Sequence, residues 1–189
     1  MMQRVEQSTG RVVLLNGPPS CGKTTLARAL RRVVREPSFH LSLDDFRRGY
    51  DNEVWQHDDG RLFERVMRGY LGALRALALA GSNVIAEAVV TPDRLDLYLA
   101  TFQDVSVVFV AVRCPLEVAV ARESGRTDRL TGPVDLPADA FNAVHSHGVY
   151  DIEVDTSAHS ADEIAIALAT NLADTVPSAF DQLRVSRHT

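Results

Sequence analysis

Residues 11–24, RVVLLNGPPSCGKT, join an apolar run to a glycine-rich loop that ends in a lysine and a threonine. The apolar run predicts a buried β-strand, and Leu26, Leu30 and Val33 then recur at the spacing of one helical face. The loop between them fits the pattern G-x-x-x-x-G-K-[ST], which is the P-loop. Its place between a predicted strand and a predicted helix is the context that this motif requires.

A P-loop binds the phosphates of a nucleotide. Gly17 and Gly22 allow backbone amides to approach an anion, and the following helix adds unpaired N–H groups and the positive end of its dipole. Lys23 can reach the β- and γ-phosphates, and the Thr24 hydroxyl can ligate Mg²⁺. The predicted nucleotide-binding residues of this loop are Gly17, Pro18, Pro19, Ser20, Cys21, Gly22, Lys23, Thr24 and Thr25.

The identity of the nucleotide follows from the lysine content. Lys23 is the only lysine among the twenty basic residues of the chain. The guanine-selective element N-K-x-D needs a second lysine, so a GTPase is disfavoured and ATP is the expected nucleotide.

The rest of the chain alternates apolar segments with helical patterns, which predicts an α/β fold with parallel strands in a single domain over residues 1–189. Helices are expected near residues 61–80, 91–102, 115–124, 136–148 and 160–172, the last with the capping-box spacing Ser160 to Glu163. Further strands are expected within residues 39–45, 83–90, 105–114 and 150–157. The tail after about residue 176 is expected to be frayed.

Composition limits the possible partners and the compartment. The formal net charge of −5 argues against general nucleic-acid binding, which needs a basic patch. Cys21 and Cys114 are too few and too far apart to predict a disulfide framework or a metal site. The polar first ten residues resemble no signal peptide, and no apolar run is long enough to cross a bilayer. A cytoplasmic protein without membrane contact is expected, and its oligomeric state is not predicted.

Acidic residues follow two of the predicted strands. Asp44 and Asp45 come after the second strand, where a carboxylate can take the proton of an acceptor hydroxyl, but an aspartate can equally begin a helix there. Glu87 stands near the end of an otherwise apolar strand, where a carboxylate is costly unless it is paired. A role in holding Mg²⁺ is favoured over simple solvent exposure.

Other polar residues give weaker signals. Arg122, Arg126 and Arg129 would share one side of a helix and could neutralise charge on a transferring phosphoryl group, or form a solvated charged face. His145 and His147 have no third ligand nearby, so no metal is assigned to them. Among the aromatic residues near Asp44, Tyr50 and Trp55 are expected to contact a ligand, because they lie in a loop-like stretch, whereas the others are expected in the core.

Several motifs together resemble the chloramphenicol phosphotransferase family, small P-loop kinases that place a phosphate on an antibiotic hydroxyl. The resemblance covers residues 11–173 and is carried by LNGPPSCGKT, LSLDD, VRCPLEVAVARESGRTDRLTG and VHSHGVYDIEVDTS. It implies a three-layer P-loop kinase fold with a five-stranded parallel sheet, ATP as donor and Mg²⁺ as helper. It also implies Asp44 as the general base and Glu87 as an acidic strand end at the metal.

The same resemblance places Arg122, Arg126 and Arg129 in a lid over about residues 122–135, and Thr156 and Ser157 near the nucleotide base. The segment after Asp44, DFRRGYDNEVWQHDDG, is shorter and more polar than the acceptor region of the chloramphenicol kinase, so the acceptor drug is not implied. An acceptor richer in hydroxyls or charge would suit Arg47, Arg48, Asp51 and Glu53, and an exposed loop explains them equally well.

The function predicted from the sequence is an ATP-dependent O-phosphotransferase for a small-molecule alcohol, with an antibiotic as the expected acceptor. Two alternatives remain open at this point. One is a kinase of metabolites or nucleotide sugars, including toxin-type kinases. The other is a regulatory module that binds ATP without catalysis, in which Asp44 is only a helix cap.

Overall fold

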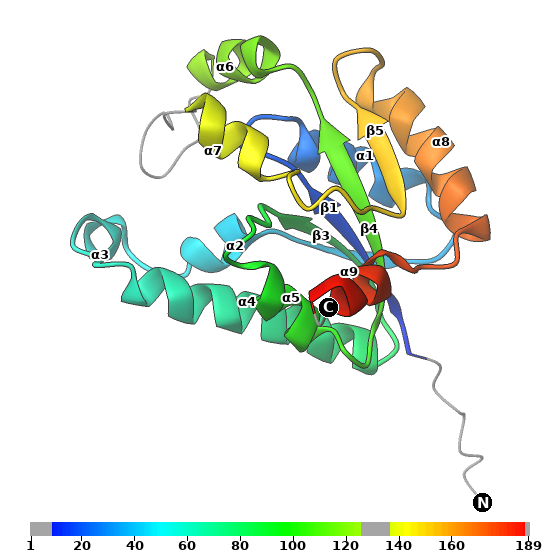
Figure 1. Ribbon diagram of the computed structural model, residues 1–189, viewed down its shortest axis with the longest axis horizontal. Helices are drawn as coiled ribbons and strands as arrows, with labels where there is room; N and C mark the ends of the chain where they lie inside the picture. Colours follow the sequence, from blue (N-terminus) through cyan, green and yellow to red (C-terminus); the bar gives the residue numbers. More distant parts are fainter. Residues whose placement is uncertain (1–8, 126–136, 188–189) are drawn as a thin grey trace, which may run out of the picture.

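A parallel sheet of five strands forms the centre of the computed structural model, which describes residues 9–125 and 137–187 (Figure 1). The strand order is β2-β3-β1-β4-β5. The strands are β1 (Arg11–Asn16), β2 (Ser38–Leu41), β3 (Asn83–Ala88), β4 (Ser106–Arg113) and β5 (Ile152–Asp155). The predicted α/β fold with five parallel strands is therefore confirmed.

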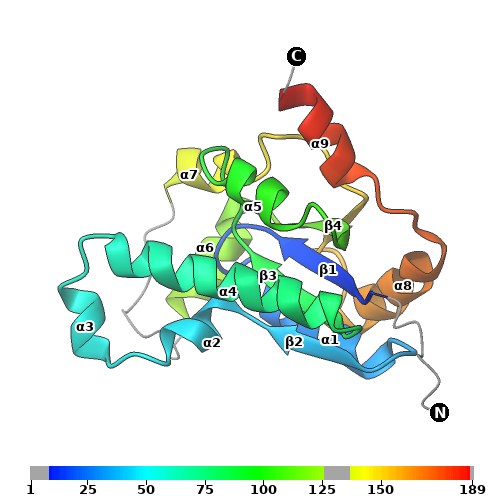
Figure 2. The same cartoon turned by 90° about the horizontal axis from the view of Figure 1, so that it is seen from below.

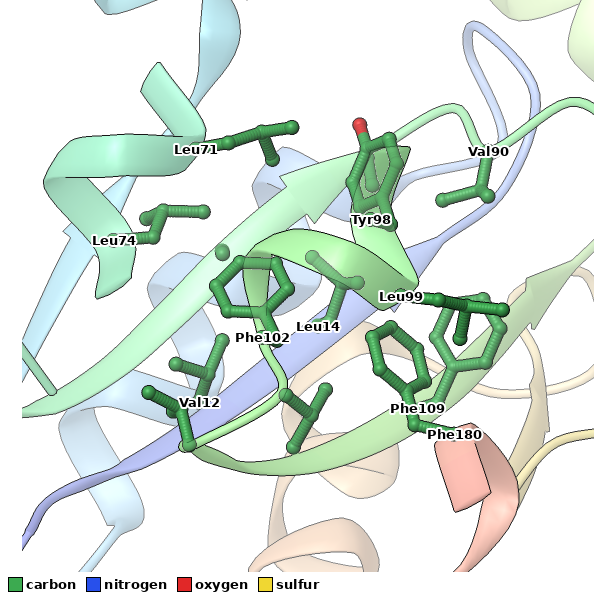
Figure 3. Packing of buried hydrophobic residues seen from close by; sticks show 14 of the residues in the cluster. Val12, Leu14, Leu71, Leu74, Val90, Tyr98, Leu99, Phe102, Phe109 and Phe180 are labelled. Carbon is green, nitrogen blue, oxygen red and sulfur yellow. The ribbon is translucent and has the colours of Figure 1, made fainter. Parts of the chain in front are cut away.

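Side chains of β1 alternate between two hydrophobic cores, one on each face of the sheet. Val12 and Leu14 join the core under α4 (Arg61–Leu79), α5 (Leu95–Thr101) and α9 (Ala179–Arg187). Figure 3 shows part of this cluster. Val13 and Leu15 join the core under α1 (Lys23–Val33) and α8 (Ala161–Asp174). A strand that is buried on both faces reads as the continuous apolar run from which the strand was predicted.

The second expected strand ends earlier than the sequence predicted. β2 stops at Leu41, and α2 (Leu43–Arg47) begins after Ser42. The Ser42 side chain accepts a hydrogen bond from the Asp45 N–H while the Asp45 carboxylate accepts one from the Ser42 N–H, which is a complete capping box. The short helix α3 (Asn52–Gln56) follows and leads into α4.

The chain after residue 176 also differs from the prediction. A frayed tail was expected, but residues 179–187 form α9, and Phe180 and Leu183 are buried in the core beside α5. Phe180 contacts the rings of Phe102 and Phe109, so the helix is held by its apolar face.

The carboxyl ends of the strands define one end of the molecule. Figure 1 shows α2, α6 (Leu116–Ser124) and α7 (Ala138–Ala143) at this end. In Figure 2, α2 and α3 lie beyond the sheet at the same end. In open parallel sheets, ligands bind outside these strand ends. Residues 126–136 of the predicted lid, with Arg126 and Arg129, lie outside the described residues. Within residues 9–125 and 137–187, no helix is long and apolar enough to cross a membrane.

Candidate active site

The P-loop has the backbone geometry that an anion site needs. Gly22 precedes α1 with a φ of 98°, a left-handed conformation that favours glycine. A Cβ atom on Gly17 would lie 2.4 Å from the Val112 carbonyl oxygen, so the close approach of loop and strand requires glycine there. Within the described chain, no side chain caps α1, which leaves its first N–H groups for a ligand.

The Lys23 ammonium lies back over the loop. It donates hydrogen bonds of 2.8 Å to the carbonyl oxygens of Gly17 and Pro18. Its nitrogen also lies 3.9 Å from the Cys21 sulfur, which is a weak acceptor. An ammonium group has three N–H donors, so one of them can leave this sulfur for a phosphate oxygen without loss of the two carbonyl contacts.

Thr24 and Glu87 meet beside the loop. The Thr24 hydroxyl donates a 2.7 Å hydrogen bond to Glu87 Oε2, and His40 Nε2 lies 2.8 Å from Glu87 Oε1. Glu87 is 7% exposed, so the sequence alternative of a solvent-facing strand end is wrong. The carboxylate is paired on both oxygens, as its burial demands. Oxygen donors of this kind suit Mg²⁺, which commonly takes one or two carboxylates and completes its shell with water and phosphate.

A buried tyrosine fixes the strand ends that carry these groups. The Tyr70 hydroxyl of α4 lies 2.8 Å from the Glu87 carbonyl oxygen and 3.2 Å from that of Leu41, and it accepts from the Glu87 N–H at 3.1 Å. Burial of this side chain raises its pKa well above the usual value, so the hydroxyl stays neutral. Tyr70 thereby links the end of β2, at Leu41, to β3 at Glu87.

The structure separates the two aspartates that the sequence left equivalent. Asp45 is engaged in the capping box with Ser42. Burial acts to raise the pKa of Asp45, but hydrogen bonds from Ser42 and the charge of Arg48 outweigh it and hold this pKa below its usual value. Asp44 is not the helix cap and lies in the cavity wall, 3.5 Å from Arg47 Nη1. Asp44 is thus the aspartate that can meet a ligand.

Arg122 and the 156–157 loop approach the P-loop from the other side. Arg122 donates to the Thr156 hydroxyl at 3.0 Å and to its carbonyl oxygen at 2.8 Å, and the Thr156 hydroxyl donates to the Cys21 carbonyl at 2.6 Å. Ser157 instead bonds Asp155. Near the same loop, Glu123 is 4% exposed and accepts from Ser20, so this part of α6 is not the solvated charged face considered above.

These elements enclose one cavity of about 800 Å³. Of the predicted site residues, its walls include Pro19, Ser20, Gly22, Lys23, Thr24, Thr25, Asp44, Glu87 and Arg122. The predicted residues Gly17, Pro18, Cys21, Thr156 and Ser157 lie outside these walls, behind or beside the loop. P-loop residues and acidic and basic side chains from distant parts of the sequence therefore line a common space.

Several lining residues were not predicted from the sequence, namely Arg28, Ser42, Leu43, Arg47, Phe63, Met67, Ala88, Val89, Arg94, Tyr98 and Gly125. Arg28 lies one helical turn after Thr24, which was a usable signal. Arg94 follows β3 at the carboxyl edge of the sheet, where the rule for parallel sheets directs a search. Arg47 was considered for an acceptor rich in hydroxyls or charge, but an exposed loop explained it equally well.

The remaining sequence expectations concern aromatic residues and histidines. Tyr50 and Trp55 were expected at the ligand, but they contact each other outside the cavity walls, whereas Phe63 lines them. His145 Nδ1 lies within hydrogen-bond distance of the Tyr150 hydroxyl, at 2.6 Å, and the His147 ring stacks on Phe109. Within the described ranges, no group of three or more metal-ligating side chains occurs.

Comparisons with known proteins bear on the family and the fold of this chain. The family model described as chloramphenicol phosphotransferase-like protein matches residues 10–173. Rv2636 of Mycobacterium tuberculosis, named as an inferred O-phosphotransferase, is 30% identical over 201 residues, which cover 93% of this chain and 88% of the relative.

Two solved structures share the fold. The tunicamycin resistance protein of Deinococcus radiodurans has 18% identity and a TM-score of 0.64, over 86% of this chain and 95% of that one. Shikimate kinase from Acinetobacter baumannii, solved with shikimate, has 17% identity and a TM-score of 0.64, over 89% of this chain and 95% of that one.

Proposed function

This chain belongs to the chloramphenicol phosphotransferase-like family, and we propose that it transfers the γ-phosphoryl group of ATP to a hydroxyl group of a small molecule. Membership makes it a P-loop phosphotransferase that uses ATP. The observation that carries the proposal is that Lys23, Thr24, Glu87 and Asp44 line one cavity.

Each of these residues has a role that its surroundings support. The N–H groups at the start of α1 and the Lys23 ammonium would bind the β- and γ-phosphates. Arg122, held against Thr156, would place a guanidinium on the same side. Phosphoryl transfer needs little from the protein beyond positioning and charge stabilisation, and these donors supply both.

Thr24 and Glu87 would hold Mg²⁺, because their oxygens already meet at 2.7 Å in a half-buried setting. When bound with ATP, the metal ion neutralises charge on the transferring group. His40 contacts the second oxygen of Glu87 and keeps this carboxylate turned toward Thr24.

Asp44 would accept the proton of the acceptor hydroxyl. Its side chain is 43% exposed in the cavity wall, and among the described residues its carboxylate has only the long 3.5 Å contact with Arg47. A positioned general base contributes about 10² to 10⁴ in rate. The acceptor is proposed as a small alcohol. That this alcohol is an antibiotic remains a prediction, which rests on the family resemblance.

The test compares two neighbouring aspartates. ATP affinity is measured by calorimetry with Mg²⁺, and turnover by coupled ADP release over a panel of hydroxyl-bearing antibiotics and metabolites. Asp44→Asn should keep ATP affinity and lose about 10²-fold or more in turnover. Asp45→Asn, the matched control outside the cavity walls, should retain most of it. Equal turnover in Asp44→Asn and the unchanged protein would remove Asp44 as the base. ATP binding without turnover of any acceptor would support a regulatory module instead, and absent ATP binding would remove the proposal entirely.

A further inference from the structure

The cavity walls divide into two parts by the elements that supply them. The P-loop, the start of α1 and the end of α6 supply one part, with Lys23 and Arg122. Helices α2 and α4 and the turn before α5 supply the other part, with Arg47, Phe63 and Arg94. Asp44 belongs to α2 and hence to the second part. If the P-loop binds ATP, this second part is where the acceptor meets the base.

Arg47 is held in place but keeps free hydrogen-bonding capacity. Its guanidinium carbon lies 4.9 Å from the centre of the Trp55 ring, and its carbonyl oxygen accepts from Trp55 Nε1 at 3.1 Å. Its contact with Asp44 is 3.5 Å, at the limit of a hydrogen bond. Among the described residues, its buried Nε has no hydrogen-bond partner. A guanidinium has five N–H donors, so most of its capacity is unused.

Arg94, in the turn before α5, is held in a similar way. Its guanidinium carbon lies 4.8 Å from the centre of the Phe63 ring, and both residues line the cavity. Its ion pair with Asp93 is long at 3.9 Å, and Asp93 is 75% exposed. Such a pair contributes little and leaves the guanidinium available. The turn that carries Arg94 is fixed by a 3.0 Å hydrogen bond from Arg187 to the Pro92 carbonyl oxygen.

The charges of the walls are unbalanced. Among the described residues of the walls, five cationic side chains, Lys23, Arg28, Arg47, Arg94 and Arg122, stand against two carboxylates, Asp44 and Glu87. Lys23 and Arg122 lie on the P-loop side, where the triphosphate is expected. Arg47 and Arg94 then remain as positive charges beside an acceptor. Two guanidinium groups held on aromatic rings are suited to a planar or tetrahedral anion.

We infer that the acceptor carries an acidic group, a carboxylate or a phosphate, beside the hydroxyl that is phosphorylated, and that Arg47 and Arg94 bind this group. The inference rests on the proposed function and narrows its substrate class to hydroxy acids and phosphorylated alcohols. Binding of the acidic group orients the hydroxyl toward Asp44, which is on the same short helix as Arg47.

Trp55 provides a readout that needs no known acceptor, because it is the only tryptophan and contacts Arg47. The full chain is saturated with Mg²⁺ and a non-hydrolysable ATP analogue, and inorganic phosphate or gluconate is titrated while Trp55 fluorescence is recorded. A saturable change is expected with one or both anions, but not with sorbitol or with chloride at equal ionic strength. The two anions distinguish a phosphate site from a carboxylate site.

Arg94→Gln should weaken this anion binding about 10- to 100-fold, the range for one charge-assisted hydrogen-bonded pair. Arg48→Gln, at the C-cap of α2 next to Arg47 but outside the cavity walls, is the matched control and should bind as the unchanged protein does. No saturable change with either anion, or equal binding in Arg94→Gln, overturns the inference.

Turnover gives the second measurement. Acid and neutral pairs, such as ribose 5-phosphate with ribose and hydroxy acids with their methyl esters, are compared by coupled ADP release. Acidic members should be preferred, and Arg94→Gln should raise their KM more than it lowers kcat. A neutral best acceptor whose KM is the same in Arg94→Gln contradicts the inference but leaves the phosphotransferase proposal intact. Absence of ATP binding in the unchanged protein contradicts the phosphotransferase proposal. The fluorescence titration, repeated without nucleotide, still reports on the anion site.

Discussion

The hydroxyl group of Tyr70 offers a sharp test of how the site is supported. Tyr70→Phe removes one oxygen from a side chain that is 0% exposed and leaves the ring packing unchanged. The lost contacts are those to the Glu87 N–H and to the carbonyl oxygens of Glu87 and Leu41. A buried polar group left without a partner costs about 1 to 3 kcal/mol. Because at least one donor and one acceptor at Glu87 are affected, we expect a loss of about 2 to 4 kcal/mol in the free energy of unfolding.

Tyr98→Phe is the matched control. Tyr98 is 1% exposed, but among the described residues its hydroxyl has only a weak acceptor, the Met67 sulfur at 3.7 Å, so its removal should cost less than about 1 kcal/mol. Urea unfolding measures both variants, and with an m-value of about 2 to 3 kcal/mol/M the midpoint of Tyr70→Phe should fall by about 1 M. Equal midpoints for the two variants would refute the view that Tyr70 satisfies the ends of β2 and β3.

Three further outcomes are expected. Ser160→Ala should lower the free energy of unfolding by about 1 kcal/mol, because it removes the capping box with Glu163, and the same urea titration measures it. Phe180→Ala should lower it by about 3 to 5 kcal/mol, since α9 is docked through this 4% exposed ring; a loss below 1 kcal/mol would mean that α9 is not docked. Burial lowers the pKa of His145 from 6.5 to about 4. As the pH falls from 6.5 to 4, the unfolded chain binds this proton before the folded chain does, so stability should decrease over this range. His145→Gln should flatten this part of the profile of melting temperature against pH.

The parts of the fold that could be predicted are those in which neighbouring residues carry the signal. β1, the P-loop and α1 are continuous in sequence, and the strand is apolar on both faces because both cores need it. The capping box at Ser160 was predicted by the same local rule that the structure later shows at Ser42. At Ser42 the sequence is ambiguous, because LSLDD reads equally as the end of a strand. Without the helix, the sequence does not distinguish the roles of Asp44 and Asp45.

The parts that could not be predicted depend on contacts between distant residues. Glu87 was expected to need a partner, but that His40 supplies one follows only from β2 lying beside β3. That Thr24 supplies the other follows from β1, which leads into the P-loop, pairing with β3 at Glu87. The tail was expected to fray because its few apolar residues look too sparse alone. Phe180 packs against the buried rings of Phe102 and Phe109, and this contact stabilises the short helix α9.

The same contrast explains why the chemistry is easier to read than the acceptor. The proposed phosphate site consists of backbone amides and one lysine within residues 17–25, so a local sequence pattern predicts it. The proposed acceptor wall joins Arg47, Phe63 and Arg94 from three separate elements, which the sheet order β2-β3-β1 brings to the same cavity. Substitutions in α2, α4 or the turn before α5 can change that wall without touching the P-loop. Relatives that share the P-loop and the base need not share an acceptor, and the charge of this wall is a better guide to the acceptor than the motif is.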